Sequence, residues 1–126
     1  MSTSLSLVLP IRNAEHTLTN NLQDVLDVLS DLTERFEVLL VDEGSTDQTT
    51  ELAHNLARQY PQLRIARRRP GDPPVSALQA GLSQATGDVV LVQNRHARFS
   101  PHYVRRMWEM SVDDQGADVP VQGSAG

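Results

Sequence analysis

The sequence predicts an α/β fold built on a mostly parallel sheet with helices on both faces. Four short apolar stretches alternate with four segments whose apolar residues recur every three or four positions. Such alternation is typical of strand–helix–strand units, whose crossovers are right-handed. The clearest unit is Phe36–Thr49, in which the apolar run Val38–Val41 ends in two acids, Asp42 and Glu43. Open α/β sheets bind ligands at such carboxyl ends of strands.

The first unit combines a short strand with a long amphipathic helix. The strand is predicted over Leu5–Leu9 and is expected to stop at Pro10, which has no N–H to donate to a ladder. After the loop, Asn13 is a predicted N-cap for a helix that continues to about Leu32. The residues expected on its buried stripe are Leu18, Leu22, Val25, Leu29 and Leu32.

The second unit contains the strand Phe36–Val41 and a helix predicted from about Thr46 to Gln59. Its start is placed there because Ser45-Thr46-Asp47-Gln48 has the spacing of a capping box. Pro61 is expected to stop the chain from continuing as a helix. The residues expected to be buried on this helix are Leu52, Ala53, Leu56 and Tyr60.

The third unit begins with the alternating strand Leu63–Arg67 and a loop rich in turn-forming residues. A shorter helix is predicted over Val75–Gln84, with Gly87 as a favourable residue just past its C-terminus. The fourth strand is predicted over Asp88–Gln93.

The last predicted helix begins at Ser100, an N-cap followed by proline at the first helical position. We expect one domain over residues 1–112, and a short final strand or flexible tail over residues 113–126. The residues expected to share the buried face of this helix are Tyr103, Val104, Met107 and Trp108.

Composition excludes several classes of function. The chain has 126 residues, 39% apolar and 21% charged, which suits one soluble domain. Its net charge of -5 argues against nucleic-acid binding, and the absence of cysteine excludes disulfides. No apolar run approaches the roughly 20 residues that span a bilayer. The N-terminus resembles no signal peptide, so we expect a cytoplasmic protein with no membrane span.

The acids Asp42 and Glu43 allow two interpretations on local grounds: part of a ligand site, or a surface turn capped by chance. The predicted topology favours the site. It brings four loops to one edge of the sheet, and these loops carry the densest charge in the chain. The four loops are Pro10–Asn13, Asp42–Ser45, Arg67–Pro74 and Asn94–Phe99.

Five motifs stand in order along the chain: Ser6–Asn13, Val41–Asp47, Ala77–Leu82, Ala85–Leu91 and Gly116–Ser124. They resemble, in this order, the opening strand with its P-x-Y-N loop, V-D-D-G-S-T-D, A-L-N-A-G-L, A-x-G-D-y-v-l and G-A-D-V-V-x-G-S of family 2 glycosyltransferases, which are nucleotide-diphospho-sugar transferases of the GT-A fold. The likeness covers the N-terminal half of the family and is greatest to its polyprenyl- and dolichol-phosphate sugar synthases. It implies a three-layer, Rossmann-like half-domain with a sheet of four to five strands.

The resemblance implies that the first two loops bind a nucleotide. Glu43 takes the place of the second aspartate of the family, which accepts a hydrogen bond from the base. Arg12 takes the place of an aromatic residue that stacks on the base, and a guanidinium can also stack there. The implied nucleotide-binding residues are Pro10, Arg12, Asn13, Asp42, Glu43, Gly44 and Ser45.

The family motif D-x-D, which holds Mg²⁺ or Mn²⁺ on the diphosphate, aligns with Asn94-Arg95-His96 in this sequence. These residues are poor ligands for a hard cation, so we predict no cofactor and no metal site. One interpretation is an eroded site with solvated arginines, which the residue types favour. The other is direct, metal-free neutralisation of the diphosphate. The arginines available for it are Arg67, Arg69, Arg95 and Arg98.

The resemblance implies an ancestral reaction of inverting sugar transfer by direct displacement. The sequence ends at Gly126, before the segment in which the family carries its catalytic base, and His16, His96 and His102 are not credible substitutes. We therefore expect a catalytically impaired domain, a pseudoenzyme on its own, that binds a nucleotide or nucleotide sugar. Two alternatives remain open: a non-enzymatic scaffold that forms homo-oligomers through a bare sheet edge, and a metal-independent transferase that a partner chain completes.

Overall fold

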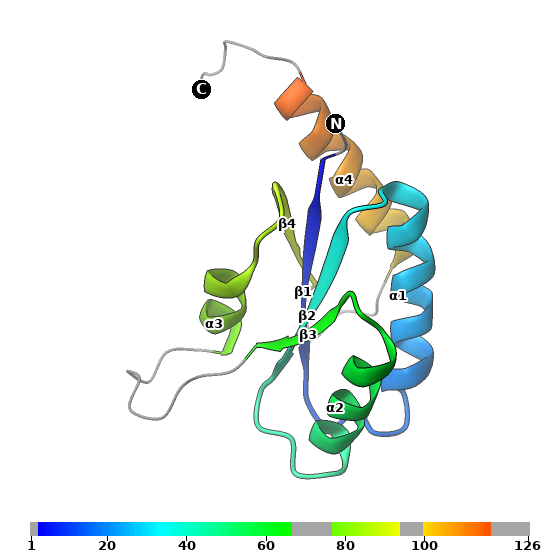
Figure 1. Cartoon of the computed structure of the whole chain (residues 1–126), viewed down its shortest axis with the longest axis vertical. Coiled ribbons are helices and arrows are strands. Elements are labelled where there is room, and N and C mark those ends of the chain that lie inside the picture. Colours follow the sequence, from blue (N-terminus) through cyan, green and yellow to red (C-terminus); the bar gives the residue numbers. More distant parts are fainter. Residues whose placement is uncertain (1–2, 67–76, 94–99, 117–126) are drawn as a thin grey trace.

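The computed structural model describes residues 3–66, 77–93 and 100–116 (Figure 1). Its strands form one sheet in the order β3-β2-β1-β4, and every pairing is parallel. This confirms the predicted α/β fold with a parallel sheet. The elements in chain order are β1 (Leu5–Ile11), α1 (Leu18–Leu32), β2 (Phe36–Asp42), α2 (Thr49–Gln59), β3 (Leu63–Ala66), α3 (Ala77–Gln84), β4 (Val89–Val92) and α4 (Pro101–Gly116).

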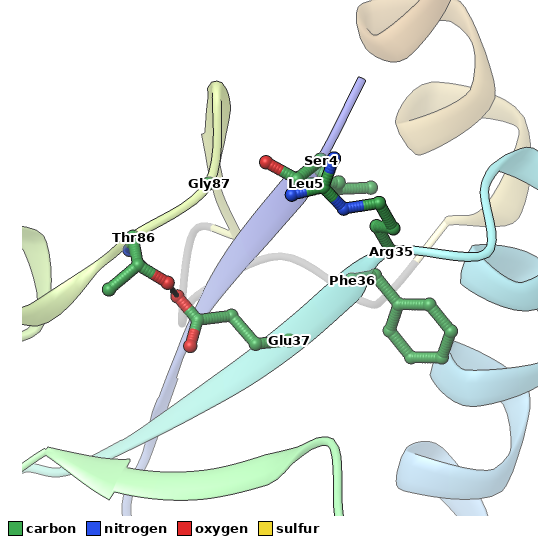
Figure 2. Close-up of a pocket in the computed structure, with 7 residues that line it drawn as sticks. All are labelled: Ser4, Leu5, Arg35, Phe36, Glu37, Thr86 and Gly87. Atoms are coloured by element: carbon green, nitrogen blue, oxygen red, sulfur yellow. Dashed lines mark hydrogen bonds between the residues drawn. The ribbon is translucent and has the colours of Figure 1, made fainter. Parts of the chain in front are cut away.

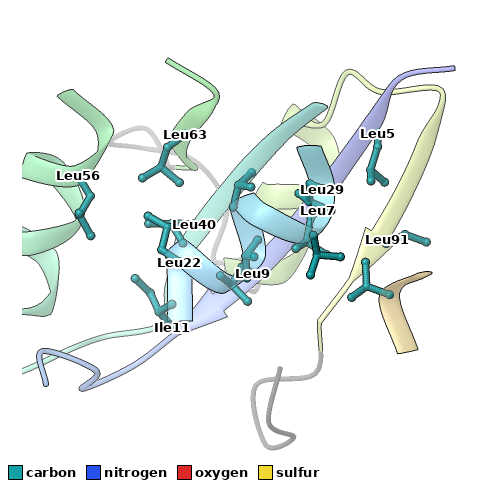
Figure 3. Packing of buried hydrophobic residues seen from close by; sticks show 14 of the residues in the cluster. Leu5, Leu7, Leu9, Ile11, Leu22, Leu29, Leu40, Leu56, Leu63 and Leu91 are labelled. Atoms are coloured by element: carbon teal, nitrogen blue, oxygen red, sulfur yellow. The ribbon is translucent and has the colours of Figure 1, made fainter. Parts of the chain in front are cut away.

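Helices cover both faces of the sheet, α1, α2 and α4 on one face and α3 on the other (Figure 1). Successive side chains of a strand point to opposite faces, so the central strand β1 contributes to both layers. Leu7 and Leu9 pack against Leu22 and Leu29 of α1 in the larger core (Figure 3). Val8 instead packs on the α3 side, in a smaller cluster with residues of β2 and β3.

The buried stripes of α1 and α2 follow the predicted periodicity. On α1, Leu18, Leu22, Val25 and Leu29 are buried, and Leu32 packs at the margin of the core. Each such leucine contributes about 1.5–3 kcal/mol by leaving water. On α2, Ala53 and Leu56 are buried, while Leu52 and Tyr60 are partly buried against the same core.

Both of the first two helices begin later than predicted. The helix α1 starts at Leu18 with Thr17 at the N-cap, and Asn13 has a left-handed φ of 49° in the preceding loop. The helix α2 starts at Thr49, so the predicted capping box from Ser45 to Gln48 does not form. The physical reason is that these polar side chains bond across to the neighbouring loop, as described below.

Pro10 lies inside β1, which continues to Ile11, and the predicted stop at this proline is therefore wrong. Alternate residues of a parallel strand bond to opposite neighbours. The Gln93 N–H donates to the Val8 carbonyl at 2.9 Å, so the backbone nitrogen of Pro10, two residues further along, also faces β4. Pro10 has no N–H with which to continue the ladder on this side, and the β1–β4 pairing ends at Val8, whereas the pairing with β2 on the other side continues to Ile11.

The start of α4 is confirmed, whereas one residue of its buried face is not. The Tyr103 N–H donates to Ser100 Oγ at 3.2 Å, as expected of an N-cap. Val104 and Trp108 are buried and Met107 packs partly on the core, but Tyr103 is 53% exposed because it points away from the sheet. The helix continues to Gly116, past the predicted boundary, and the predicted strand after it lies outside the described residues.

Gly87 was predicted to lie just past the C-terminus of the third helix, but α3 already ends at Gln84. The glycine has a different role. A Cβ atom on Gly87 would lie 2.6 Å from the backbone nitrogen of Ser6. The glycine therefore lets the chain pass close to β1 before it begins β4.

Within the described parts of the chain, no helix is both long and apolar enough to cross a bilayer. The predicted cytoplasmic location stays a prediction.

Candidate functional site

The carboxyl ends of β1 and β2 lie level with each other at the lower edge of the molecule in Figure 1. The strand register pairs Ile11 with Asp42, and the Glu43 N–H extends the ladder by donating to the Ile11 carbonyl at 2.9 Å. Two loops leave the sheet here, the first loop (residues 12–17) and the second loop (residues 43–48). The structure thus brings together the two loops that the sequence predicted to form a nucleotide site.

Asn13 joins the two loops by hydrogen bonds in both directions. Its N–H donates to Ser45 Oγ at 3.0 Å, and its side-chain Oδ1 accepts from the Thr46 N–H at 2.8 Å. The left-handed φ of Asn13 is one that asparagine tolerates better than most residues. Asn13 and Ser45 are therefore bonded to each other, and their predicted contact with a nucleotide stays a prediction.

Asp47 makes a second junction between the loops. Its carboxylate accepts from the backbone N–H groups of Glu15 and Thr49, at 3.3 and 2.9 Å, and from the Thr49 hydroxyl. The Thr49 Oγ1 in turn accepts from the Ala14 N–H at 2.7 Å. The hydrogen bonds from Thr49 lower the pKa of Asp47, so this carboxylate is ionised at neutral pH.

Asp42 is held as a carboxylate at the end of β2. Partial burial opposes its ionisation, but hydrogen bonds from the Thr50 hydroxyl and from Ser45 outweigh burial and lower the pKa of Asp42. The Ser45 N–H donates to Oδ1 at 2.9 Å and the Thr50 hydroxyl donates to Oδ2. A carboxylate oxygen has further lone pairs, so Asp42 keeps capacity to accept from a ligand.

The neighbours of Asp42 complete the described part of the site. Glu43 is half-buried, whereas Arg12 is exposed in the first loop. Gly44 has a φ of +92° and no atom lies within 4 Å of where its Cβ would be, so the turn requires glycine for its backbone conformation alone. Pro10 is half-buried within β1 and lines the same strand end.

The predicted diphosphate-binding arginines and the degenerate metal motif lie outside the described residues. The described residues hold no group of three or more histidine, aspartate and glutamate side chains placed to bind a metal ion. The predicted residues that lie outside the described ranges are Arg67, Arg69, Asn94, Arg95, His96 and Arg98.

A second polar cluster, which the sequence did not predict, lies at the opposite, amino-terminal edge of the sheet (Figure 2). Glu37 of β2 accepts from the backbone N–H and hydroxyl of Thr86, at 2.8 and 2.9 Å, and from the Ser6 hydroxyl at 2.6 Å. Arg64 of β3 also donates to Glu37. The residues around the adjoining hollow, of about 240 Å³, are Ser4, Leu5, Arg35, Phe36, Glu37, Thr86 and Gly87.

Because protein donors satisfy the Glu37 carboxylate, this cluster fastens strands together and is not a candidate ligand site. Ser6 also accepts from the Gly87 N–H at 2.8 Å, so the chain before β4 is fixed by both side chain and backbone. The Thr86-Gly87 pair was visible in the sequence as part of a motif, but its partner on β2 was not.

Comparison with known proteins decides the family. The family model described as glycosyl transferase family 2 matches residues 6–124. The chain belongs to glycosyl transferase family 2. The match includes both loops of the candidate site and the strand ends that carry them.

Two relatives illustrate the branch of the family. The undecaprenyl-phosphate 4-deoxy-4-formamido-L-arabinose transferase of Photorhabdus laumondii subsp. laumondii is 32% identical over 118 residues, which cover 91% of this chain and 35% of that protein. The dolichyl-phosphate beta-glucosyltransferase of Trichomonas vaginalis is 32% identical over 96 residues, covering 72% of this chain and 30% of that protein. These relatives confirm the predicted resemblance to polyprenyl- and dolichol-phosphate sugar transferases.

Similarity to solved structures of GT-A glycosyltransferases confirms the GT-A fold. S. aureus TarS 1-349 in complex with UDP-GlcNAc matches with a TM-score of 0.58 and 21% identity, over 98% of this chain and 36% of that chain. Glucosyl-3-phosphoglycerate synthase from Mycobacterium tuberculosis, in complex with Mn²⁺, UDP and glucosyl-3-phosphoglycerate, matches with a TM-score of 0.51 and 26% identity, over 82% of this chain and 38% of that chain. This family 2 chain thus spans about a third of the length of the proteins it matches.

Proposed function

We propose that this family 2 chain binds the nucleotide part of a nucleotide-diphospho-sugar at the carboxyl ends of β1 and β2. The observation that carries the proposal is the position of Asp42 and Glu43, two successive carboxylates at the end of β2, inside two loops that are hydrogen-bonded to each other. The ligands of the two structural neighbours, UDP-GlcNAc and UDP, support the choice of nucleotide.

The residues of the site suit a nucleoside. Carboxylates accept hydrogen bonds from base N–H groups and ribose hydroxyls, and both donors are absent from a plain phosphate. The lowered pKa of Asp42 keeps that acceptor ionised at neutral pH. The exposed Arg12 can stack its guanidinium on the base, at the edge of the same loops.

The donor set after β4 does not fit the divalent metal that the family implies. Asn94 offers a neutral amide, Arg95 a cation and His96 a single imidazole, whereas Mg²⁺ and Mn²⁺ prefer several oxygen ligands, carboxylates above all. We derive no step through a metal. Direct neutralisation of the diphosphate by arginines of the loops after β3 and β4 remains a prediction from the sequence alone.

Sugar transfer is a proposal for the whole protein, and we expect no turnover from residues 1–126 alone. A general base works best with a pKa near the working pH, whereas the pKa of Asp42 is lowered away from it. His16 is exposed, 3.7 Å from the Glu15 carboxylate and ahead of α1, and His102 is exposed in the first turn of α4. The chemistry of the described site therefore supports binding and not proton transfer.

Calorimetric titration with UDP, GDP and their sugars, each with and without Mn²⁺, tests the proposed binding. We expect saturable binding that does not depend on the metal, and a loss of about tenfold in affinity for Glu43→Gln. Glu109→Gln, which removes the same charge from an exposed position on α4, is the matched control and should bind as the wild type does. Saturable binding by none of these nucleotides would overturn the proposal.

A second candidate function is a scaffold that pairs with another copy through β4. This strand lies at the edge of the sheet, and its side chains Val90 and Val92 are 39% and 37% exposed on the α3 side. Leu82 of α3 is 43% exposed. Edge strands without charged residues favour pairing with other chains.

Sedimentation velocity over a range of concentrations tests this candidate. We expect a dimer in the wild type and a monomer in the double variant Val90→Lys and Val92→Lys, because lysine on an exposed edge opposes pairing. A wild type that stays monomeric at the highest concentration would remove the scaffold hypothesis and leave nucleotide binding untouched.

A further inference from the structure

Three consecutive backbone N–H groups of the first loop all donate to side chains of the second loop and of the start of α2. Asn13 donates to Ser45 Oγ at 3.0 Å, Ala14 to Thr49 Oγ1 at 2.7 Å, and Glu15 to Asp47 Oδ2 at 3.3 Å. These partners are 32–35 residues away along the chain. One loop thus presents a row of donors, and the other presents three matching oxygen acceptors.

Consecutive backbone N–H groups next to a left-handed residue form a concave donor array that in other proteins binds anions. Asn13, with its φ of 49°, provides the left-handed residue here. In this chain the array is filled by an internal anion, the Asp47 carboxylate, and by two hydroxyls. The array is therefore a fixed junction between the loops, and a phosphate would have to displace Asp47 to reach it.

The junction is connected to the proposed binding carboxylates through the second loop. Asn13 Oδ1 accepts from the Thr46 N–H at 2.8 Å, and the adjacent Ser45 N–H donates to Asp42 Oδ1 at 2.9 Å. Thr49 is completely buried, so its hydroxyl has no water to replace Ala14 or Asp47 as a partner. Loss of the junction would release the turn that orients Asp42 and Glu43.

We propose that Asn13, Asp47 and Thr49 are positioning residues, which hold Asp42 and Glu43 in the geometry that binds the nucleotide. This assignment rests on the proposed function. It gives the residues of the two loops two roles: Asn13 and Ser45 hold the loops to each other, and Arg12, Asp42 and Glu43 meet the ligand, with Asp42 itself held in place by Ser45 and Thr50.

The matched variants Thr49→Val and Thr49→Ser test the assignment. Valine keeps the shape of threonine but leaves the Ala14 N–H without its acceptor, whereas serine keeps the hydroxyl. Asn13→Gly is a second probe, because glycine keeps the left-handed backbone and removes only the side-chain acceptor. Glu37→Gln, which loosens the cluster at the opposite edge of the sheet, is the control for a general loss of stability.

Two measurements are made on each variant of residues 1–126: UDP affinity by calorimetry, and hydrogen exchange of the Ala14 and Ser45 amides without ligand. We expect Thr49→Val and Asn13→Gly to speed exchange at Ser45 and to weaken UDP binding about tenfold. Thr49→Ser should keep both the exchange rate at Ser45 and the UDP affinity of the wild type. Glu37→Gln should lower the unfolding midpoint without weakening UDP binding.

Two results would overturn the assignment. One is a Thr49→Val variant that exchanges faster at Ala14 and Ser45 but binds UDP as the wild type does. The other is a Glu37→Gln variant that loses as much UDP affinity as Thr49→Val, which would reduce the junction to general stability. A wild type that does not bind UDP overturns the proposed function instead. The hydrogen-exchange rates would then test the junction by themselves: equal rates in wild type and Thr49→Val would show that the junction does not exist.

Discussion

Glu37 and Thr86, 49 residues apart, are joined by two hydrogen bonds to one carboxylate oxygen, from the Thr86 N–H at 2.8 Å and from its hydroxyl at 2.9 Å. This contact fastens the turn before β4 to β2, although β1 lies between these strands in the sheet. Ser6 of β1 donates to the same oxygen at 2.6 Å, and Arg64 of β3 donates to the other. Three strands and the turn before β4 are therefore connected through one side chain.

We predict that Glu37→Gln lowers the free energy of unfolding by about 1–3 kcal/mol. The glutamine amide group places an N–H₂ among donors that need an acceptor, and the Glu37 side chain is only 13% exposed. Urea unfolding followed by circular dichroism measures the change. Glu34→Gln, at an exposed position just before β2, is the matched control. An unfolding midpoint equal to that of the wild type would show that the cluster contributes nothing.

The pH dependence of stability follows from the same carboxylate. Burial opposes ionisation of Glu37, but the hydrogen bonds from Ser6 and Thr86, with Arg64, outweigh it and lower its pKa below the model-compound value of 4.5. A group whose pKa is lowered by folding stabilises the native state above its unfolded-state pKa, and this stabilisation is lost as the pH falls through the folded-state pKa. Asp42, Asp47 and Asp88 have lowered pKa values as well.

We therefore predict that the wild type loses stability as the pH falls below about 4.5. The difference in unfolding free energy between wild type and Glu37→Gln should have its full size at pH 6–7. It should shrink as the pH falls below about 4.5, because a protonated glutamate resembles the variant. Urea titrations at a series of pH values measure it. A difference that stays constant down to pH 3 would contradict the proposed ionisation.

Two glycines are predicted to differ in how badly they tolerate alanine. A Cβ on Gly87 would lie 2.6 Å from the Ser6 nitrogen and 2.8 Å from the Leu5 carbonyl carbon, both backbone atoms of the central strand. A Cβ on Gly81 would meet mainly the side chains of Val41 and Val8, at 2.6 and 3.0 Å, which can repack in part. Overpacking of this kind costs about 1–3 kcal/mol.

Thermal unfolding of the two alanine variants measures the difference. We expect Gly87→Ala to unfold at a lower temperature than Gly81→Ala, and Ser83→Ala on the exposed side of α3 to behave as the wild type. If Gly81→Ala unfolded at the lower temperature instead, the backbone of β1 would yield to an added Cβ more easily than Val8 and Val41 do next to α3.

Periodicity was sufficient to predict the sheet and the helices. The apolar residues of α1, from Leu18 to Leu29, have the three-and-four spacing of a helix that is buried on one face. The continuous apolar run Val38–Val41 is typical of a strand that is buried on both faces. Both patterns can therefore be recognised from neighbouring residues alone. The order of the five motifs along the chain was sufficient to predict the family. These signals depend on residues that are close together in the sequence.

The helix starts and the roles of polar residues could not be predicted in the same way. Asn13 and Ser45 are good caps by type, but they bond to each other and Asn13 also bonds to Thr46, more than 30 residues away, and these tertiary contacts displace the local caps. The effect of Pro10 was misjudged for a related reason, because its missing N–H faces only β4, while the pairing of β1 with β2 on the other side continues to Ile11. Glu37 gave no local signal at all, since its three partner segments lie on other strands and turns.

A titration of ¹⁵N-labelled protein with UDP, followed through the backbone amide resonances, tests directly whether the ends of β1 and β2 bind a nucleotide. We predict saturable shifts concentrated in the first loop and in residues 42–50, with small changes at Ser4, Thr86 and Gly87 at the opposite edge. Glu43→Gln should require about ten times more UDP for the same shifts. Saturable shifts centred on the Thr86 edge, or no shifts at all, would contradict a nucleotide site at the ends of β1 and β2.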